Sequence, residues 1–298
     1  MRPQDSADRP SREMPEAPHL LRAGRHLLSL SLTQIILIAW AIMVIFPFVW
    51  MIYSSFKTNN QIFGSPWGLP TSLYWENFLS AWTTASIGRY FVNSIIVVGF
   101  SLALTLMLSA MTAYVLARYE FFGRQLIYYS FILGLAFPVF LAIVPLFFVV
   151  QGLGLLGTYP GLILVYVGYS LPFSVFFLTS FFRTLPSEIA ESGLIDGCSH
   201  FGVFFRLMLP LATPGLLSIG IFNFLGMWNQ YLLPLVLNPD PTKFVLAQGL
   251  AALAINQGYR GNWGQLFAGL TIAMMPILIV YATLQSRLQA GLTVGAIK

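Results

Sequence analysis

Six long apolar stretches constrain what this sequence can fold into. A membrane-spanning helix needs about 20 consecutive, mostly apolar residues, and the stretches that meet this requirement are Ile35–Tyr53, Phe91–Leu116, Leu126–Val150, Tyr159–Phe182, Leu211–Leu237 and Phe267–Leu284. They are continuously apolar and do not alternate with polar residues, which argues against a β-barrel. Only 8% of the residues are charged, against about 25% in a typical soluble domain. The sequence therefore predicts an all-α integral membrane protein with six transmembrane helices.

The basic residues give the orientation of these helices. If the N-terminus is cytoplasmic, the cytoplasmic segments hold Arg2, Arg9, Arg12, Arg22, Arg25, Arg118, Arg124, Arg183, Arg206, Arg287 and Lys298. The outer segments hold only Lys57, Arg89, Lys243 and Arg260. This bias is the one that the positive-inside rule expects, with both termini in the cytoplasm. The net charge of +5 is explained by topology, because the basic residues form no aromatic-interleaved patch for nucleic acid.

The first 30 residues differ from the rest of the chain. They mix Arg, Asp, Glu, Pro and Ser without a clear period, and we expect residues 1–30 to form a disordered cytoplasmic tail. Residues 31–298 then form one transmembrane domain. The polar start is too long for a cleaved signal, so the first span is expected to be a retained anchor. The only cysteine, Cys198, leaves no disulfide framework.

A polar segment from Arg183 to Pro210 separates the fourth and fifth apolar stretches and falls on the cytoplasmic side. It holds three of the ten acidic residues, Glu188, Glu191 and Asp196. We expect two short helices around a hinge, with carboxylates favoured near the N-terminus of the first helix and Gly197 in the left-handed conformation that ends it. A solvated connector is the simpler interpretation. However, the charges alternate with apolar side chains that a mere connector does not need, namely Ile189, Leu194, Ile195, Phe201, Phe204 and Phe205. The segment is therefore interpreted as a docking surface.

Some residues inside the spans also carry predictions. Pro138 and Pro145 are expected to kink the third span, and Pro172 to break the fourth. Asn223 and Gln230 are seven residues apart, so they share a helical face and are candidates for a solute path. The alternative is that they bond to neighbouring helices, as polar groups in spans often do. The two residues that precede Gln230 are Trp228 and Asn229, and they are interpreted as packing or gate residues.

Several mechanisms are disfavoured by what the sequence lacks. All Asp, Glu, Lys, Arg and His residues fall outside the six stretches, whereas proton-coupled carriers need ionisable groups within the membrane. There is no His-Glu-x-x-His, GxSxG or phosphate-binding GxxxxGK[ST] motif, and these are the signatures of common enzyme and ATPase sites. The chain is therefore not expected to be an enzyme or to bind a metal. Energy for uphill transport would have to come from another polypeptide.

A motif in the polar segment resembles a known family. Glu191-Ser192-Gly193, Gly197 and Leu207-Met208-Leu209-Pro210 resemble the EAA motif of ABC importer permeases, E-A-A-x₃-G-x₉-I-x-L-P, with its spacing kept. The departures are Ser192 and Gly193 in place of two alanines and Leu207 in place of isoleucine. A glycine at position 193 loosens a helix by up to about 1 kcal/mol relative to alanine.

Other stretches resemble the maltose-type, MalG-like branch of that family. The resemblance runs from about Leu37 to the C-terminus and includes Asn93-Ser94, Ala113-Tyr114, Ala117-Arg118-Tyr119, Phe122-Gly123-Arg124, Ile195-Asp196-Gly197, Trp228-Asn229 and Gly291–Lys298.

The resemblance implies a multi-pass permease subunit in a bacterial plasma membrane. Its partners would be a second related permease, two copies of a cytoplasmic ATPase and an extracytoplasmic solute-binding protein. ATP and Mg²⁺ would be used by the ATPase, with no cofactor bound by this chain. Contact with the ATPase is implied for Glu188, Glu191, Ser192, Gly193, Asp196, Gly197, Leu207, Leu209 and Pro210. A sugar is the implied solute; the alternatives are another solute, such as glycerol phosphate, and a self-sufficient carrier or channel.

Overall fold

The computed structural model describes the backbone of residues 18–294, and within it the side chains of residues 33–256 and 261–284. This part of the chain forms helices and contains no β-strand, so the predicted all-α class is confirmed. The chain divides into two compact units, residues 1–50 and residues 51–298.

The first unit consists mostly of helix α1 (Pro18–Ser54). The predicted disordered tail, residues 1–30, lies partly outside the described residues, and from Pro18 onward it is the start of α1. The predicted first span lies inside the segment Thr33–Ser54, which has a mean hydropathy of 2.7. Residues 33–49 are all exposed within the protein. Because such a surface is unfavourable in water, this segment has the character of a lipid-embedded helix.

Three further helices of the second unit are long and apolar enough to cross a membrane. They are α4 (Ile87–Arg118), α7 (Tyr159–Thr184) and α14, which runs from Trp263 to Val294 and is apolar as far as Leu284. Pro172 was expected to break the fourth span, and this prediction was wrong, because α7 is continuous through it. A proline removes one intrahelical hydrogen bond, but a membrane helix tolerates it where the freed carbonyl finds another partner.

The two remaining spans are bent. Helices α5 (Arg124–Ala136) and α6 (Val139–Gly152) meet at a bend of 106° beside Pro138. The helical segment His200–Leu211 meets α11 (Thr213–Trp228) at a bend of 72°. The predicted fifth span, Leu211–Leu237, is not one helix, since the chain leaves the helix after Trp228 and resumes as α12 (Leu232–Leu237). Counting each bent pair as one span gives six candidate spans in the described residues.

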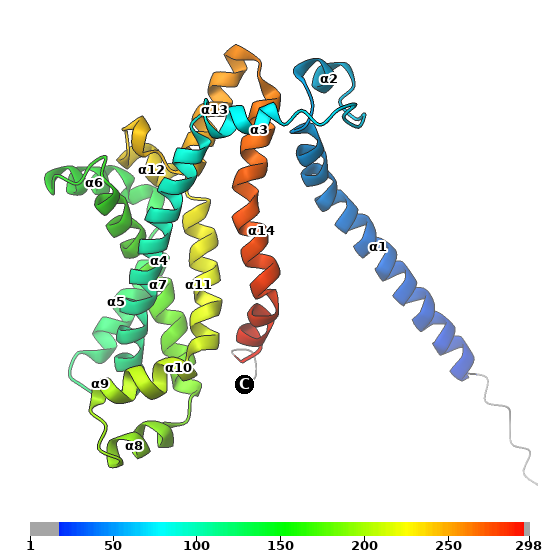
Figure 1. Ribbon diagram of the computed structural model, residues 1–298. Coiled ribbons are helices and arrows are strands. Elements are labelled where there is room, and N and C mark those ends of the chain that lie inside the picture. Colours follow the sequence, from blue (N-terminus) through cyan, green and yellow to red (C-terminus); the bar gives the residue numbers. More distant parts are fainter. Residues whose placement is uncertain (1–17, 295–298) are drawn as a thin grey trace, which may run out of the picture. The chain divides into compact units, whose positions relative to one another are not determined.

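Helices α4, α7, α11 and α14 of the second unit lie side by side (Figure 1). Helices α2 (Asn59–Gly64), α3 (Glu76–Trp82) and α13 (Leu246–Arg260) lie at one end of this unit, and the polar segment lies at the other. Helices α4 and α7 pack on each other, and both carry small buried residues: Ser101, Thr105, Ser109 and Ala113 on α4, and Ser170 and Ser174 on α7. Small side chains let two helix backbones approach closely, as is typical of membrane proteins.

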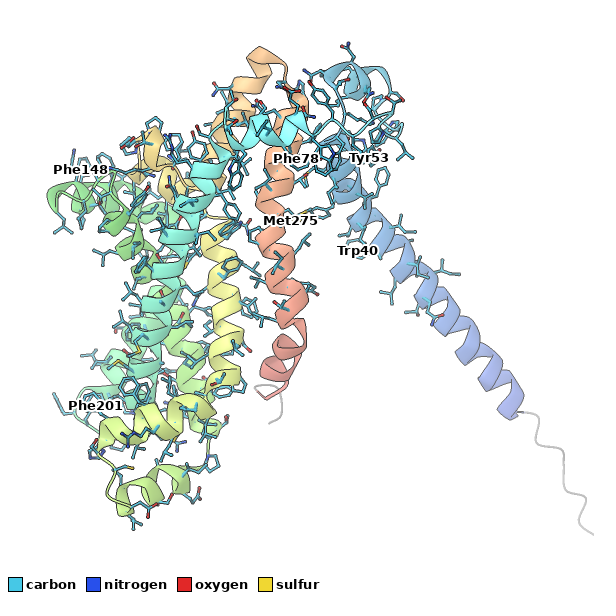
Figure 2. The ribbon with its side chains drawn as sticks, viewed as in Figure 1. Trp40, Tyr53, Phe78, Phe148, Phe201 and Met275 are labelled. Atoms are coloured by element: carbon cyan, nitrogen blue, oxygen red, sulfur yellow. The ribbon has the colours of Figure 1, made fainter. Side chains whose placement is uncertain are left out.

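The apolar core has two parts. One lies toward the end with α3 and α13 and includes Tyr166, Trp228 and Leu246. The other lies beside the polar segment and includes Tyr114, Phe182 and Met208. Figure 2 shows how densely side chains fill the space between these helices. The second part of the core fixes the polar segment on the ends of α4 and α7.

The buried pair Asn93 and Ser94 fastens the segment that follows α12. The Asn93 amide nitrogen donates to the carbonyls of Thr242 (3.1 Å) and Phe244 (2.9 Å), and its oxygen accepts from the Tyr159 hydroxyl (2.8 Å). The Ser94 hydroxyl oxygen accepts from the backbone N–H of Leu246 at 2.7 Å. These bonds satisfy backbone groups in an irregular segment, where no helix or sheet hydrogen bonds are available to them.

Lys57 has a similar role in the loop after α1. Its side chain is 1% exposed, and its ammonium donates to the carbonyls of Ser65 (3.1 Å) and Pro66 (3.0 Å). The ammonium also lies 4.8 Å from the centre of the Tyr53 ring. Removal from water lowers the pKa of Lys57 from its ordinary value. A buried lysine thus holds the loop through carbonyl oxygens and an aromatic face.

Candidate functional site

The polar segment folds as two helices joined by a tight hinge. Helix α8 (Ser187–Ile195) begins after Pro186, and α9 (His200–Val203) begins after Ser199, whose hydroxyl accepts from the N–H of Gly202 at 3.2 Å. A π-helical turn, Phe204–Met208, and the short α10 (Leu209–Leu211) lead from α9 to α11. Leu209 is half-buried and Pro210 is exposed where the chain turns into this last span.

Gly197 ends the first of these helices as the sequence predicts. Its φ angle is +84°, and the N–H of Cys198 donates to the carbonyl of Gly193 at 3.0 Å. A second N–H, that of Gly197, donates to Leu194 at 3.1 Å. The hinge therefore satisfies the final carbonyls of α8 in the way that left-handed glycine caps do.

Gly193 is buried where α8 meets the π-helical turn. A Cβ atom at this position would lie 2.6 Å from Cδ1 of Leu207 and 3.3 Å from Cγ2 of Val203. The absence of a side chain thus lets Leu207 and Val203 pack directly against the α8 backbone. Gly193 and Leu207, two of the departures from the resembling motif, therefore occupy one contact.

The acidic residues of the segment all face outward. Glu188, Glu191 and Asp196 are exposed, and none of them forms an ion pair within the described residues. Glu188 lies in the first turn of α8 and Glu191 lies almost one turn later, so the favourable interaction with the helix dipole applies mainly to Glu188. Ser192 is also exposed, and its hydroxyl donates to the carbonyl of Ile189 at 3.1 Å.

Large apolar side chains of the same segment are also exposed to solvent. Ile195 is 85% exposed and Phe201 is 69% exposed, whereas Phe204 of the same segment is buried. Figure 2 shows Phe201 at the end of the second unit where α8 and α9 lie. Exposed apolar residues rimmed by charge are typical of protein–protein contact sites.

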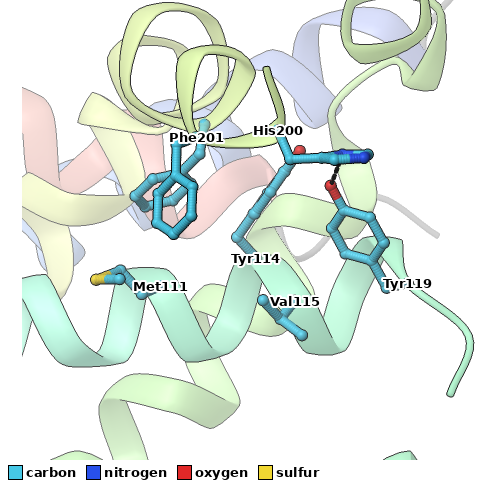
Figure 3. A pocket seen from close by; sticks show the side chains of 7 residues that line it. Met111, Tyr114, Val115, Tyr119, His200 and Phe201 are labelled. Atoms are coloured by element: carbon cyan, nitrogen blue, oxygen red, sulfur yellow. Dashed lines mark hydrogen bonds between the residues drawn. The ribbon is translucent and has the colours of Figure 1, made fainter. Parts of the chain in front are cut away.

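The end of α4 contacts the segment at two points, one before α8 and one at the start of α9. The guanidinium of Arg118 donates to the carbonyl of Leu185, just before α8. The next residue, Tyr119, places its hydroxyl 3.0 Å from Nδ1 of His200, and the two rings meet edge to face. An apolar pocket of about 330 Å³ lies between the end of α4 and α9 (Figure 3). Sequence reasoning did not predict these contacts of Arg118 and Tyr119. The only sequence feature that pointed to them was the Ala117-Arg118-Tyr119 stretch of the resemblance.

A larger cavity of about 740 Å³ lies between the helices. The bend between α5 and α6, the middle of α7 and the second half of α11 contribute its walls. Asn223 and Gln230 both line this cavity, although Gln230 lies beyond the end of α11 and shares no helical face with Asn223. The Asn223 amide nitrogen also donates to Ser174 Oγ at 2.8 Å, so the interhelical bond that was the alternative interpretation is present too.

Trp228 and Asn229 do not line this cavity. Trp228 is buried in the core, where its ring stacks on Phe224 and its N–H donates to the carbonyl of Ala273 at 3.2 Å. Asn229 is exposed and donates to the carbonyl of Leu225 at 2.9 Å. Trp228 is thus a packing residue, and sequence reasoning missed Tyr166, Tyr169 and Ser170, which α7 contributes to the cavity.

Among the described residues, no three His, Cys, Asp or Glu side chains are close enough to hold a metal ion. The bent spans, the cavity between them and the exposed segment are typical of a helical membrane-transport component.

The comparisons with known proteins agree with this class. Residues 105–294 match the family described as "Binding-protein-dependent transport system inner membrane component", and the chain belongs to this family.

Named relatives extend the match to most of the chain. It is 51% identical to the diacetylchitobiose uptake system permease protein NgcG of Streptomyces coelicolor over 268 residues, which cover 90% of this chain and 89% of that protein. It is 34% identical to the arabinooligosaccharides transport system permease protein AraQ of Halalkalibacterium halodurans, covering 87% of this chain and 92% of the relative. The chain is therefore a permease-family subunit located in the bacterial plasma membrane.

One solved structure shows the same fold. A bacterial ABC transporter involved in the import of the acidic polysaccharide alginate contains a chain that superposes with a TM-score of 0.77 at 18% identity. The superposition covers 92% of the present chain and 99% of that chain. At this identity the likeness concerns the fold alone.

Proposed function

We propose that this chain is one of two permease subunits of an ATP-driven importer for an oligosaccharide. The observation that carries the proposal is the exposed surface of α8 and α9. There, carboxylates that form no ion pair within the described residues lie next to the exposed side chains of Ile195 and Phe201. Such a surface fits a water-borne protein partner. In the proposal this partner is one copy of a dimeric cytoplasmic ATPase, which hydrolyses ATP with Mg²⁺ while this chain binds no cofactor.

The coupling follows from how the surface is attached. Movement of the ATPase against α8 is transmitted through Gly193 and Leu207 to the π-helical turn, and from there into α11. Arg118 and Tyr119 transmit the same movement to α4. Since α4, α7 and α11 pack on one another, a rigid displacement of the segment shifts the walls of the path between them.

The solute class is proposed from the relatives. NgcG is named for diacetylchitobiose and AraQ for arabinooligosaccharides, and both match at least 87% of the chain. We assign an uncharged oligosaccharide delivered by an extracytoplasmic binding protein, with N,N′-diacetylchitobiose as the first solute to test. The remaining partner is a second, related permease that completes the path.

Two measurements test this function. The full chain, tagged at its N-terminus, is recovered from native membranes, and the proteins that accompany it are identified by mass spectrometry. We expect an ATPase, a second permease and a solute-binding protein. Recovery of the chain alone would contradict the importer assignment.

The second measurement follows solute. Cells that lack this chain are compared with cells in which it is restored, using radiolabelled N,N′-diacetylchitobiose and, separately, glycerol 3-phosphate. Restoration of disaccharide uptake is expected. Restoration of glycerol phosphate uptake alone would assign another solute, and transport by the purified chain in liposomes without ATP would identify a self-sufficient carrier.

A further inference from the structure

The cavity between α5, α6, α7 and α11 contains polar groups without partners. Tyr166 lines it, is 1% exposed, and its hydroxyl makes no hydrogen bond within the described residues. A buried hydroxyl without a partner costs free energy, and a native protein retains few of them without a use. The Tyr166 hydroxyl is therefore a group that a bound molecule in this cavity would satisfy.

Other cavity groups are similarly free. The Asn223 side chain is oriented by the bond from its nitrogen to Ser174 Oγ (2.8 Å), and Ser174 in turn donates to the carbonyl of Ser170 (2.8 Å). Its oxygen Oδ1, the amide of Gln230 and the hydroxyl of Tyr169 have no hydrogen-bond partner in the described part of the chain. Together these groups offer both donors and acceptors.

The backbone around the cavity also needs partners. The chain leaves the helix between Ala136 and Val139, and this bend lines the cavity. Pro172, which lines it too, has no N–H to donate to the carbonyl of Gly168, four residues earlier on the same wall. At membrane depth, non-helical backbone is tolerated only against protein or a water-filled cavity. The cavity is therefore expected to hold water or a polar solute and not lipid chains.

The lining also discriminates among solutes. Among the described residues that line the cavity, none carries a formal charge. An anionic solute would lose its hydration without meeting a cation, which is costly in a low-dielectric site. The aromatic rings of Phe137, Phe140, Phe173 and Phe222 supply apolar faces for the C–H faces of a sugar ring. Its volume, about 740 Å³, lies in the range of small-molecule sites.

From these observations we infer that this subunit itself forms a solute-contacting subsite, built by Tyr166, Tyr169, Asn223 and Gln230, that accepts an uncharged saccharide and rejects anions. The inference rests on the proposed function, because it assumes that the chain forms part of a transport path. It goes further in assigning contact with the solute, and part of the selectivity, to this chain.

Cysteine labelling of the complete importer tests the inference. In a Cys198→Ser background, which has no other cysteine, a reporter is introduced by Gly226→Cys. A Cβ atom at Gly226 meets nothing within 4 Å, and this residue lines the cavity. The matched control is Gly99→Cys on α4, where a Cβ atom is equally unobstructed but the position does not line the cavity. A water-soluble, membrane-impermeant methanethiosulfonate is the label.

The expected result has two parts. The Gly226→Cys variant is labelled and the Gly99→Cys control is not. During ATP-driven transport, N,N′-diacetylchitobiose slows the labelling of Gly226→Cys, while glycerol 3-phosphate does not. Absence of labelling at position 226 would mean a lipid-filled cavity, and protection by glycerol 3-phosphate alone would mean an anion site. Either result overturns the inference, as does labelling that neither solute slows.

Tyr166→Phe supplies a second, independent test. Because the buried hydroxyl has no partner among the described residues and costs free energy, the variant should unfold at the temperature of the parent or at a higher one. Loss of one hydrogen bond to the solute is expected to slow disaccharide transport by about three- to tenfold at saturating binding protein. Tyr281→Phe, on the exposed face of α14, is the matched control and should leave transport unchanged. Unchanged transport in Tyr166→Phe would contradict the subsite.

The experiments distinguish a failure of the subsite from a failure of the proposed function. If the importer moves the disaccharide but Gly226→Cys is not protected and Tyr166→Phe is silent, the subsite is wrong and the proposed function stands. If the importer moves no uncharged saccharide at all, the proposed function itself fails.

Discussion

A Cβ atom added to Gly193 would lie 2.6 Å from Cδ1 of Leu207, so the α8 backbone and the π-helical turn after α9 touch through one glycine and one leucine. The two residues are departures from the resembling motif, which has alanine and isoleucine at these positions. The contact suggests that they are matched, since a smaller residue on α8 makes room for the γ-branched side chain opposite.

This matching predicts a coupling between the two positions. Gly193→Ala alone gains about 1 kcal/mol of helix propensity but overpacks the contact at a cost of about 1–3 kcal/mol. In a Leu207→Val background, which lacks the obstructing methyl group, the same substitution should be stabilising. A double-mutant cycle on thermal unfolding in detergent measures this coupling. Additive effects would mean that the two residues are not matched.

Reversal of charge at Glu191 should interrupt docking without unfolding the chain. Glu191 is exposed and without an ion pair in the described residues, so Glu191→Lys is expected to change stability by less than about 1 kcal/mol. Uptake should nevertheless be abolished, and co-purification of the ATPase should fall, while the protein still reaches the membrane.

The matched control for this charge reversal is Glu76→Lys. Glu76 is also an exposed helix residue, but it lies on α3 at the opposite end of the second unit. ATPase co-purification should therefore be retained in Glu76→Lys. Normal uptake in Glu191→Lys would show that this carboxylate does not contribute to the docking surface.

Asn93→Ala should loosen the segment between α12 and α13. The substitution removes two donated bonds, to Thr242 and Phe244, and the one accepted from Tyr159. Leaving these partners unsatisfied should cost about 3 kcal/mol of unfolding free energy. Hydrogen exchange in residues 238–246 should rise in the variant. Asn229→Ala, at an exposed amide, is the control and should change neither quantity appreciably.

The stability contributed by the turn after α12 should fall in acid, because it depends on the carboxylate of Asp240. Its carboxylate accepts from the hydroxyl of Thr242 (2.7 Å) and from the backbone N–H of Thr242 (2.9 Å), and these bonds, with the nearby Lys243 ammonium, lower the pKa of Asp240. Because the folded-state pKa lies below the unfolded-state pKa, the stabilisation is present at neutral pH. It is lost as the pH falls through the lowered value.

Asp240→Asn tests this dependence. The variant should be less stable than the parent at pH 7, and the difference should shrink between about pH 4 and lower values. Unfolding temperatures measured across this range give the comparison. A difference that does not depend on pH would mean that the Asp240 carboxylate is not the group responsible.

Local features of the sequence determined where these helices form and the left-handed backbone conformation of Gly197. Apolar length alone predicted the helices around residues 35–53, 91–116, 159–182 and 267–284, because burial of backbone in lipid forces a helix. Gly197 took its positive φ angle because no side chain opposes it. The acidic and apolar alternation after Arg183 predicted an exposed segment, because isolated charges are not buried.

Only the tertiary structure decided how these elements meet. Pro138 and Pro172 are both prolines in apolar stretches, yet one lies at a bend of 106° and the other lies within a continuous helix. The difference depends on the surrounding helices, which the local sequence does not contain. The same holds for Tyr166 and Asn223, which line one cavity, and for Arg118 at the carbonyl of Leu185. These partners are 57 and 67 residues apart in the sequence, and only helix packing brings them together.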